Sequence, residues 1–458
     1  MQQTVTIESI DNNANGIARI EGKTVFVSGA LPGEAVSIEI YKQKPSFDLA
    51  RVAEIITPSP DRVIPECPNF GVCGGCSLQH LDPLAQVSSK EKTLFDNFRH
   101  ISKIDTPPAV LPPLHADAWH YRHRARLSVR YVAKKDSVLI GFRERGSAFV
   151  ADMRECRILP QQISDLIPKL RVLVMQLSIR DKIPQIEVAA GEDVSILLFR
   201  VMQPMTAADE ELLRKFVDDN QSAVSQLQIW LQPAGLDSVY PFYPDVAERK
   251  SLYYTLPQFN LTMPFAPTEF TQVNPKLNQQ MVALAIQLLD LHENDRVLDF
   301  FCGIGNFSLA IATQCASVLG VEGSEALVKR ARENAASNNL AHKTQFTCMD
   351  LFTINADKLT NLVHTLSGRL ALHIMSSKWL IDPPRDGAFE LIKAITPENM
   401  PQRIVYVSCN PATLARDAEF LVHTLGYSLT HAGVMNMFPH TSHVESIAVF
   451  IHGNSCEN

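Results

Sequence analysis

A cysteine near the C-terminal end of the sequence has the surroundings of a reactive thiol. Residues 405–411 read Val-Tyr-Val-Ser-Cys-Asn-Pro, so Cys409 follows an apolar strand and precedes an Asn-Pro turn. In an open α/β sheet, ligands bind in the crevice at the carboxyl ends of the strands. A buried apolar cysteine is the common alternative, but the Asn-Pro turn favours a fixed thiol at the crevice. The pattern predicts a covalent nucleophile, which needs activation by local charge because a free thiol has a pKa of about 8.5.

Three further strand ends carry the chemistry of a cofactor site. Residues 296–307 form an apolar strand that runs into a turn with Gly303 and Gly305 and then into a helix. Glu322 ends the next predicted strand, nineteen residues after Gly303, where an acidic residue can bind ribose hydroxyls. Asp350 ends the third strand and could accept a hydrogen bond from an adenine amine. Each acid alone is more typical of a solvated carboxylate. Together they favour an adenosyl cofactor, without phosphates because the third glycine of a dinucleotide fingerprint is missing.

Two further carboxylates, at positions 382 and 445, complete the set of candidate reactive residues. Asp-Pro-Pro-Arg at 382–385 follows an apolar strand and would form a rigid lip over the cofactor, although it does not choose the chemistry by itself. Glu445, in His-Val-Glu-Ser at 443–446, is the candidate general base. Taken alone, this glutamate is more typical of a solvated strand residue. Cys302, beside the Gly-rich turn, is a rival nucleophile for which we expect a packing role.

A second group of cysteines lies far from these residues in the sequence. Cys67, Cys73 and Cys76 are separated by five and then two residues, with three glycines between them. Cys156 is the only other cysteine in this half of the chain and would complete a tetrahedral set. Four thiolates suit zinc and an iron–sulfur cluster, and the spacing alone does not choose between them. A disulfide is not expected in a cytosolic enzyme.

The charge distribution keeps RNA as a candidate partner. The net charge of −7 argues mildly against nucleic acid, because binding the phosphate backbone requires Lys and Arg. Residues 115–146, however, contain eight Lys/Arg and three acids, interleaved with aromatic residues. Cations with aromatic rings suit single-stranded RNA, whose bases stack on the rings. A solvated strand face is an equally good reading of this segment.

The elements around these residues predict several domains, as expected for 458 residues. Residues 1–58 read as five short strands and predict a small barrel of the oligonucleotide-binding type. Residues 59–265 predict an α+β central domain with the cysteine cluster and the basic strands. From 266 to 458, helices and strands alternate, which predicts a doubly wound parallel sheet ending in a pair of strands at 428–435 and 444–451. No membrane helix and no secretory signal are visible, so we expect a soluble, cytoplasmic protein. We also expect it to be a monomer.

Five segments in this order resemble the RNA uracil-C5 methyltransferase family: FTQVN at 270–274, DFFCGIGNF, DPPR, SCNP and HVES. The resemblance covers the whole chain, since the N-terminal barrel is similar to the TRAM domain of that family. It implies a class I, Rossmann-like methyltransferase domain that binds S-adenosylmethionine through six residues: Gln272, Phe301, Asn306, Glu322, Asp350 and Asp382. Phe300 stands where the family often has Leu, which should only alter packing. Asp350 stands where Asn is expected in some relatives.

The resemblance also implies a reaction. A Cys409 thiolate would add to carbon 6 of uracil, which makes carbon 5 nucleophilic towards a sulfonium methyl, and Glu445 would remove the carbon 5 proton. The segment CPNFGVCGGC is similar to the one that carries a [4Fe–4S] cluster in the large-ribosomal-subunit branch. We therefore expect this cluster on the four cysteines and a 23S ribosomal RNA uridine as substrate. The alternatives are the transfer-RNA branch and a non-catalytic iron–sulfur RNA-binding module, which would have no use for Cys409.

Overall fold

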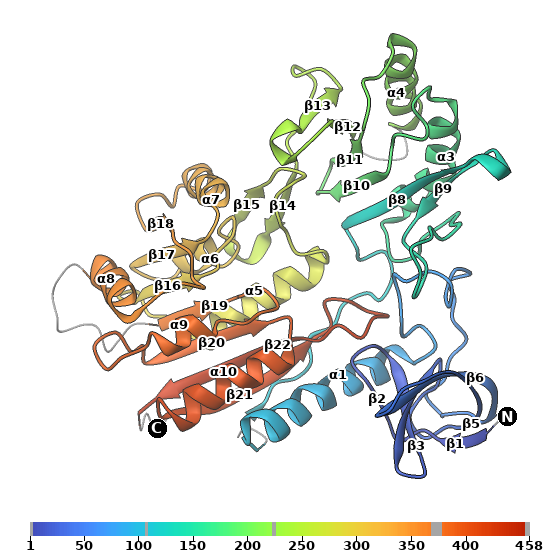
Figure 1. The fold of residues 1–458 in the computed structure, drawn as a ribbon. Coiled ribbons are helices and arrows are strands. Elements are labelled where there is room, and N and C mark those ends of the chain that lie inside the picture. The colour runs from blue at the N-terminus through green and yellow to red at the C-terminus, as the bar shows by residue number, and fades with distance from the viewer. Residues whose placement is uncertain (1–2, 106–108, 222–225, 368–377, 454–458) are drawn as a thin grey trace.

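The N-terminal part of the chain folds into a small, strongly curved β-sheet (Figure 1). The computed structural model describes residues 3–105, 109–221, 226–367 and 378–453. The strand order is β1-β5-β6-β4-β3-β2, and the strands are β1 Gln3–Thr6, β2 Ser9–Ile10, β3 Asn15–Ile20, β4 Lys23–Ser28, β5 Ala35–Gln43 and β6 Phe47–Thr57. Val36 and Ile38 share the buried face because successive side chains point to opposite sides of a strand. The predicted strands are confirmed, except that the first is interrupted between β1 and β2.

A second six-stranded sheet, in the order β13-β12-β11-β10-β8-β9, forms the middle of the chain. Its strands are β8 Arg124–Val132, β9 Ser137–Gly141, β10 Gln185–Ala190, β11 Ser195–Arg200, β12 Leu227–Gln232 and β13 Tyr240–Tyr243. Its helices are α2 Gln161–Ser164, α3 Leu166–Gln176 and α4 Ala207–Asn220. Helix α4 begins at a capping box between Thr206 and Asp209, which satisfies backbone N–H groups that a helix start leaves unpaired. The α+β prediction for this part is confirmed.

The C-terminal part is an eight-stranded sheet in the order β18-β17-β16-β19-β20-β22-β21-β7. Its strands are β16 Arg296–Phe300, β17 Ser317–Glu322, β18 Thr344–Cys348, β19 Lys378–Ile381, β20 Arg403–Ser408, β21 Tyr427–Met435, β22 Glu445–His452 and β7 Ala109–Val110. A hairpin of β14 Tyr253–Leu256 and β15 Leu261–Pro264 precedes it. The strands from β18 to β20 are parallel, whereas β22 runs antiparallel to both of its neighbours. The strand order reverses between β16 and β19, which is the switch point where such sheets bind ligands.

Helices cover both faces of this sheet (Figure 1). One face carries α5 Pro275–Leu289, α6 Ser308–Ala312 and α7 Glu325–Ser337, and the other carries α1 Pro83–Asn97, α8 Ala356–Ser367, α9 Phe389–Lys393 and α10 Pro411–His423. In β20, Val405 and Val407 enter the first core while Ile404 and Tyr406 enter the second. A strand buried on both faces is apolar throughout, which is why these segments read as continuous apolar runs.

Two elements cross the sequence division at residue 265. Helix α1 and strand β7 fall within 59–265, yet Val87 and Leu94 of α1 pack in the same core as Leu414 of α10, and β7 pairs with β21. The chain therefore contributes to the C-terminal sheet before it forms the central one. The domain limits at 58 and 265 stay predictions. Among the helices of the described ranges, none combines the length and the apolar character needed to cross a membrane.

Candidate active site

The carboxyl ends of β16, β17, β19 and β20 border a cavity of about 570 Å³, a size typical of small-molecule sites. Every residue that the sequence assigned to catalysis or cofactor binding lines this cavity: Gln272, Phe301, Asn306, Glu322, Asp350, Asp382, Cys409 and Glu445. Phe270, Phe352, Phe438 and His443 also line it, although the sequence pattern singled out none of their side chains. The structure brings all eight predicted residues to one place, while their individual roles stay predictions.

The turn after β16 presents backbone groups to the cavity. Phe301 (φ +62°) and Gly303 (φ +56°) both adopt the left-handed conformation. Glycine adopts it freely, whereas a phenylalanine loses on the order of 1–2 kcal/mol there. The carboxylate of Glu322 accepts hydrogen bonds from the N–H groups of Gly303 (3.0 Å) and Ser324 (3.1 Å). The end of β17 thus fixes the shape of the turn, and the acid predicted to bind ribose lies directly against it.

Two residues to which the sequence did not point hold Asn306 in place. Asn306 Oδ1 accepts hydrogen bonds from the Tyr254 hydroxyl (2.9 Å) and from Asn278 Nδ2 (3.0 Å), and Asn306 Nδ2 donates to Asn278 Oδ1 (2.9 Å). Tyr254 belongs to β14 and Asn278 to α5. The orientation of the Asn306 amide is therefore set by contacts from two distant elements. No local sequence signal marks either partner, because both look like ordinary residues of their own elements.

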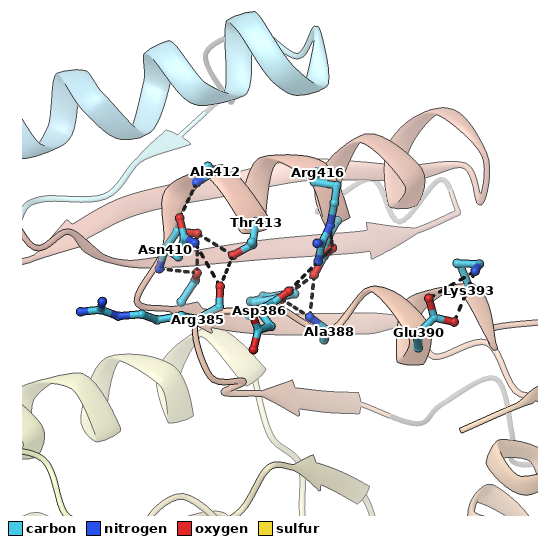
Figure 2. Close-up of polar contacts among 12 residues, drawn as sticks. Arg385, Asp386, Ala388, Glu390, Lys393, Asn410, Ala412, Thr413 and Arg416 are labelled. Carbon is cyan, nitrogen blue, oxygen red and sulfur yellow. Dashed lines mark hydrogen bonds and ion pairs between the residues drawn. The ribbon is translucent and has the colours of Figure 1, made fainter. Parts of the chain in front are cut away.

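The turn that carries Cys409 is bonded to the loop after β19. Asn410 caps helix α10: its Oδ1 accepts a hydrogen bond from the Ala412 N–H (3.1 Å), while its Nδ2 donates to the Arg385 carbonyl oxygen (3.0 Å) (Figure 2). The Thr413 hydroxyl donates to the same carbonyl (3.2 Å). The Asn-Pro that follows the cysteine therefore has a structural role on both sides. It begins a helix and locks the Asp-Pro-Pro-Arg loop against the thiol's turn.

Glu445 is the first residue of β22 and pairs across the sheet with Met435, the last residue of β21. It is only 7% exposed, so it is not a solvated strand residue. Burial raises its pKa to about 8, and Asp382 adds to the increase, while Lys90 and Arg385 oppose it. A carboxyl group that titrates near the working pH can take up and release a proton, as general acid–base catalysis requires.

Cys409 is half-buried beside two carboxyl groups. Burial raises the pKa of its thiol to about 12, Glu445 and Asp382 add to the increase, and Arg385 opposes it. Burial also raises the pKa of Asp382 to about 7. Without ligands the thiol is therefore protonated at neutral pH. A positive charge entering the cavity would lower the pKa of all three groups, because it favours their charged or deprotonated forms.

Cys302 reaches the same cavity but is only 4% exposed. Burial raises the pKa of its thiol well above the usual value, and nearby Asp299 and Glu322 add to the increase. Its sulfur also lies close to Gly320, where an added Cβ would stand 2.8 Å from Sγ. This close packing supports the expected packing role.

The four cysteines of the other predicted site do not line this cavity. Cys67, Cys73, Cys76 and Cys156 line one small pocket together with Phe142 and Met153. Burial raises the pKa of the Cys76 and Cys156 thiols to about 12, and the other cysteines of the set add to it. Within the described residues, no group of three or more His, Cys, Asp or Glu side chains is arranged to hold a metal ion.

In the basic segment 115–146, some of the charged side chains face solvent and others are partly buried in the protein. In β8, Arg126 and Arg130 are exposed, and Arg126 Nε lies 3.1 Å from a carboxylate oxygen of Glu187. Arg124 is half-buried and donates a hydrogen bond to the Pro267 carbonyl oxygen (2.7 Å). Part of the charge that suggested RNA binding therefore has a structural role, while the exposed arginines of β8 are the ones that solvent or a phosphate backbone can reach.

Two protein families match most of the chain. Residues 84–452 match the family described as tRNA (uracil-5-)-methyltransferase, and residues 2–53 match the TRAM domain. The first match contains all eight residues that line the cavity and were predicted from the sequence. The second covers most of the N-terminal sheet.

Curated relatives and one solved structure match along the whole length. The 23S rRNA (uracil(1939)-C(5))-methyltransferase RlmD of Nitrosospira multiformis is 52% identical, covering 98% of both chains. The protein of the same name from Cupriavidus necator is 51% identical, covering 98% of this chain and 100% of the relative. The tRNA (uracil-54, C5)-methyltransferase of Pyrococcus abyssi, solved with S-adenosyl-L-homocysteine, superposes with a TM-score of 0.71 at 22% identity, covering 98% of this chain and 100% of that one. At this identity, the last match supports the fold.

Proposed function

The chain belongs to the tRNA (uracil-5-)-methyltransferase family, and from this premise we propose that it methylates carbon 5 of a uridine in 23S ribosomal RNA. S-adenosylmethionine is the methyl donor. The choice of 23S RNA rests on relatives that match along the whole length at about 50% identity and whose names state that substrate. The observation that carries the chemistry is that Cys409, Glu445 and the six residues assigned to the cofactor line one cavity.

The methyl donor supplies an electrophilic methyl group and a positive charge. In this proposal Glu322 and Asn306 hold its nucleoside part at the turn after β16. The support is that Glu322 bonds to this turn, and that Tyr254 and Asn278 fix Asn306. Asp382 and Cys409 line the same cavity near the β19 and β20 strand ends. The positive charge favours the thiolate, since burial, together with two neighbouring carboxyl groups, otherwise keeps the thiol protonated.

The protein's own residues carry out two steps on the uracil ring. The Cys409 thiolate forms a bond to carbon 6, and the electron pair of the 5,6 double bond moves towards carbon 5. Carbon 5 then bonds to the methyl group as the bond between that methyl and the donor's sulfur breaks, which leaves S-adenosylhomocysteine. Glu445 removes the remaining proton from carbon 5, the double bond re-forms, and the bond between carbon 6 and sulfur breaks, releasing the thiolate. The covalent intermediate divides one difficult reaction into two easier ones.

We further propose that Cys67, Cys73, Cys76 and Cys156 ligate a [4Fe–4S] cluster. The support is that four thiols from two distant segments line one pocket and influence each other's pKa. Thiols with a raised pKa become ligands only when a metal displaces their protons. The cluster has no part in the methyl transfer. A monomeric enzyme in the cytoplasm, where ribosomal RNA is processed, completes the proposal.

The test uses 23S ribosomal RNA and transfer RNA that lack native modifications, each tritiated at carbon 5 of uracil. The protein should release tritium from the ribosomal RNA and add methyl groups that mass spectrometry places on carbon 5. The Glu445→Gln variant should form an RNA–protein adduct that survives denaturation, and Cys409→Ala should form none. Methylation of transfer RNA alone would overturn the substrate, and methylation with full retention of tritium would overturn the chemistry.

A further inference from the structure

The connection between β21 and β22 sets the position of Glu445. Met435 ends β21 and Glu445 begins β22, and the two residues pair across the sheet. Residues 436–444 join them and contribute Phe438 and His443 to the cavity lining. In Figure 1 this connection extends beyond the sheet towards the N-terminal sheet. Any element that holds the connection therefore also influences the place of the Glu445 carboxylate.

A buried lysine on α1 holds the start of this connection. Lys90 is 3% exposed, and its Nζ donates hydrogen bonds to Asn436 Oδ1 (2.7 Å) and to the Phe438 carbonyl oxygen (2.9 Å). Asn436 directly follows Met435, the cross-strand partner of Glu445. Lysine is rarely buried so completely, because removing its charge from water is costly. A methionine would fill a similar space without this cost, so packing alone does not explain the residue.

The charges around Lys90 and Glu445 give the lysine an electrostatic role as well. Asp382 disfavours the ionisation of Glu445, whereas Lys90 and Arg385 favour it. The Cys409 thiol also faces Glu445, which raises the pKa of that thiol. The groups that face Lys90 are Glu445, His440 and His443. Arg385 is exposed, so solvent and salt screen its charge, whereas the Lys90 ammonium is screened much less.

We propose that Lys90 is a positioning residue for Glu445, which fixes the connection that carries the carboxylate and supplies a buried positive charge opposite it. This inference rests on the proposed role of Glu445 as the base. An ionised base needs a nearby positive charge because burial and the neighbouring Asp382 both oppose its negative charge. Burial disfavours the charged form of both groups: it lowers the pKa of Lys90 to about 7 and raises that of Glu445 to about 8. The attraction between Lys90 and Glu445 opposes both shifts, so each group favours the charged form of the other.

Other contacts hold the same connection, so loss of Lys90 should not unfold it. The Gln86 side chain accepts a hydrogen bond from the His440 N–H (2.8 Å), and the Tyr121 hydroxyl donates to the Pro439 carbonyl oxygen (3.0 Å). The His440 carbonyl also accepts from the Ser77 N–H (2.8 Å). These bonds come from α1 and from the segments around the cysteine pocket. They anchor the connection without adding a positive charge near Glu445.

The test compares Lys90→Met with Lys90→Arg and with the matched control Lys92→Met. Lys92 lies on the same helix, is exposed, and forms an ion pair with Asp96 (2.5 Å). In Lys90→Met we expect the denaturation-resistant RNA adduct to accumulate, as in Glu445→Gln, because the proton is removed too slowly. The rising limb of tritium release against pH should move upwards by on the order of one unit, the size of effect of a nearby opposite charge on a carboxyl. Lys90→Arg and Lys92→Met should keep the midpoint.

The Asn436→Ala variant tests whether Lys90 acts by holding the connection or by its positive charge. It also provides a test if Lys90→Met does not fold. It removes one hydrogen bond but keeps the cation, so the adduct should accumulate with an unchanged pH midpoint. If Lys90→Met and Asn436→Ala both turn over normally while Glu445→Gln traps the adduct, the Lys90 inference is wrong and the function stands. If Glu445→Gln itself turns over normally, both the Lys90 inference and the proposed role of Glu445 as the base are wrong. Equal slowing at every pH, without adduct, would also refute the inference.

Discussion

The reactivity of Cys409 in the ligand-free protein gives a direct test of the site's electrostatics. A thiol of pKa about 12 has a thiolate fraction at pH 8 that is roughly 2,500-fold smaller than that of a free cysteine of pKa about 8.5. A more basic thiolate is also a better nucleophile, and for a Brønsted coefficient near 0.4–0.5 this raises the reaction rate of the thiolate about thirtyfold. We therefore expect alkylation of Cys409 by iodoacetamide to be about a hundredfold slower than that of a free thiol at pH 8.

The pH profile is the decisive part of this measurement, because partial burial of Cys409 slows alkylation for steric reasons too. Peptide mass spectrometry would follow Cys409 with the exposed Cys348 in the same sample as a reference. The Cys409 rate should still rise at pH 10 without a plateau. In Glu445→Gln the rate should exceed that of the unchanged protein above pH 8, where Glu445 is ionised, and match it below about pH 7, where the carboxyl is neutral. An inflection at or below pH 9, or no effect of Glu445→Gln above pH 8, would refute the reasoning.

Three further predictions concern the cofactor, the cysteine pocket and the fold. Glu322→Gln should weaken S-adenosylmethionine binding about tenfold to a hundredfold in calorimetry, because a charged hydrogen bond contributes roughly 1.5–3 kcal/mol; unchanged affinity would remove Glu322 from the site. Protein prepared without oxygen should be brown and hold roughly four irons. The Cys73→Ser variant should lose both the colour and the iron, and the control Cys348→Ser should keep them. A colourless protein that holds zinc would contradict the cluster. Lys378→Met breaks a buried ion pair with Asp295 (2.8 Å) and should lower the free energy of unfolding in urea by about 3–5 kcal/mol. Adding Asp295→Leu removes the unpaired charge and should restore part of that loss.

Much of the C-terminal half could be predicted from local pattern. Helix α5 spans Pro275–Leu289, in the part of the chain where helices and strands were expected to alternate. Asn274 and Pro275 are a strong helix start, and the Asn274 side chain caps the helix. The strand β17 also agrees, since apolar runs between polar turns are a property of the segment itself. The motifs at the strand ends could be assigned to one site for the same reason. The carboxyl ends of parallel strands meet at one edge, whatever the loops between them.

Other features depend on which segments meet in space. The burial of Glu445, and hence its raised pKa, follows from the cover that the β21–β22 connection and its neighbours provide, and nothing in His-Val-Glu-Ser indicates it. Lys90 reads as one more polar residue of an amphipathic helix until the fold places it against Asn436. The same is true of Tyr254 and Asn278, which hold Asn306. Sequence determined the elements and the reacting groups, because these depend on residue type and short-range order. Tertiary structure alone decided charge balance and positioning, because both depend on desolvation and on contacts between residues hundreds of positions apart.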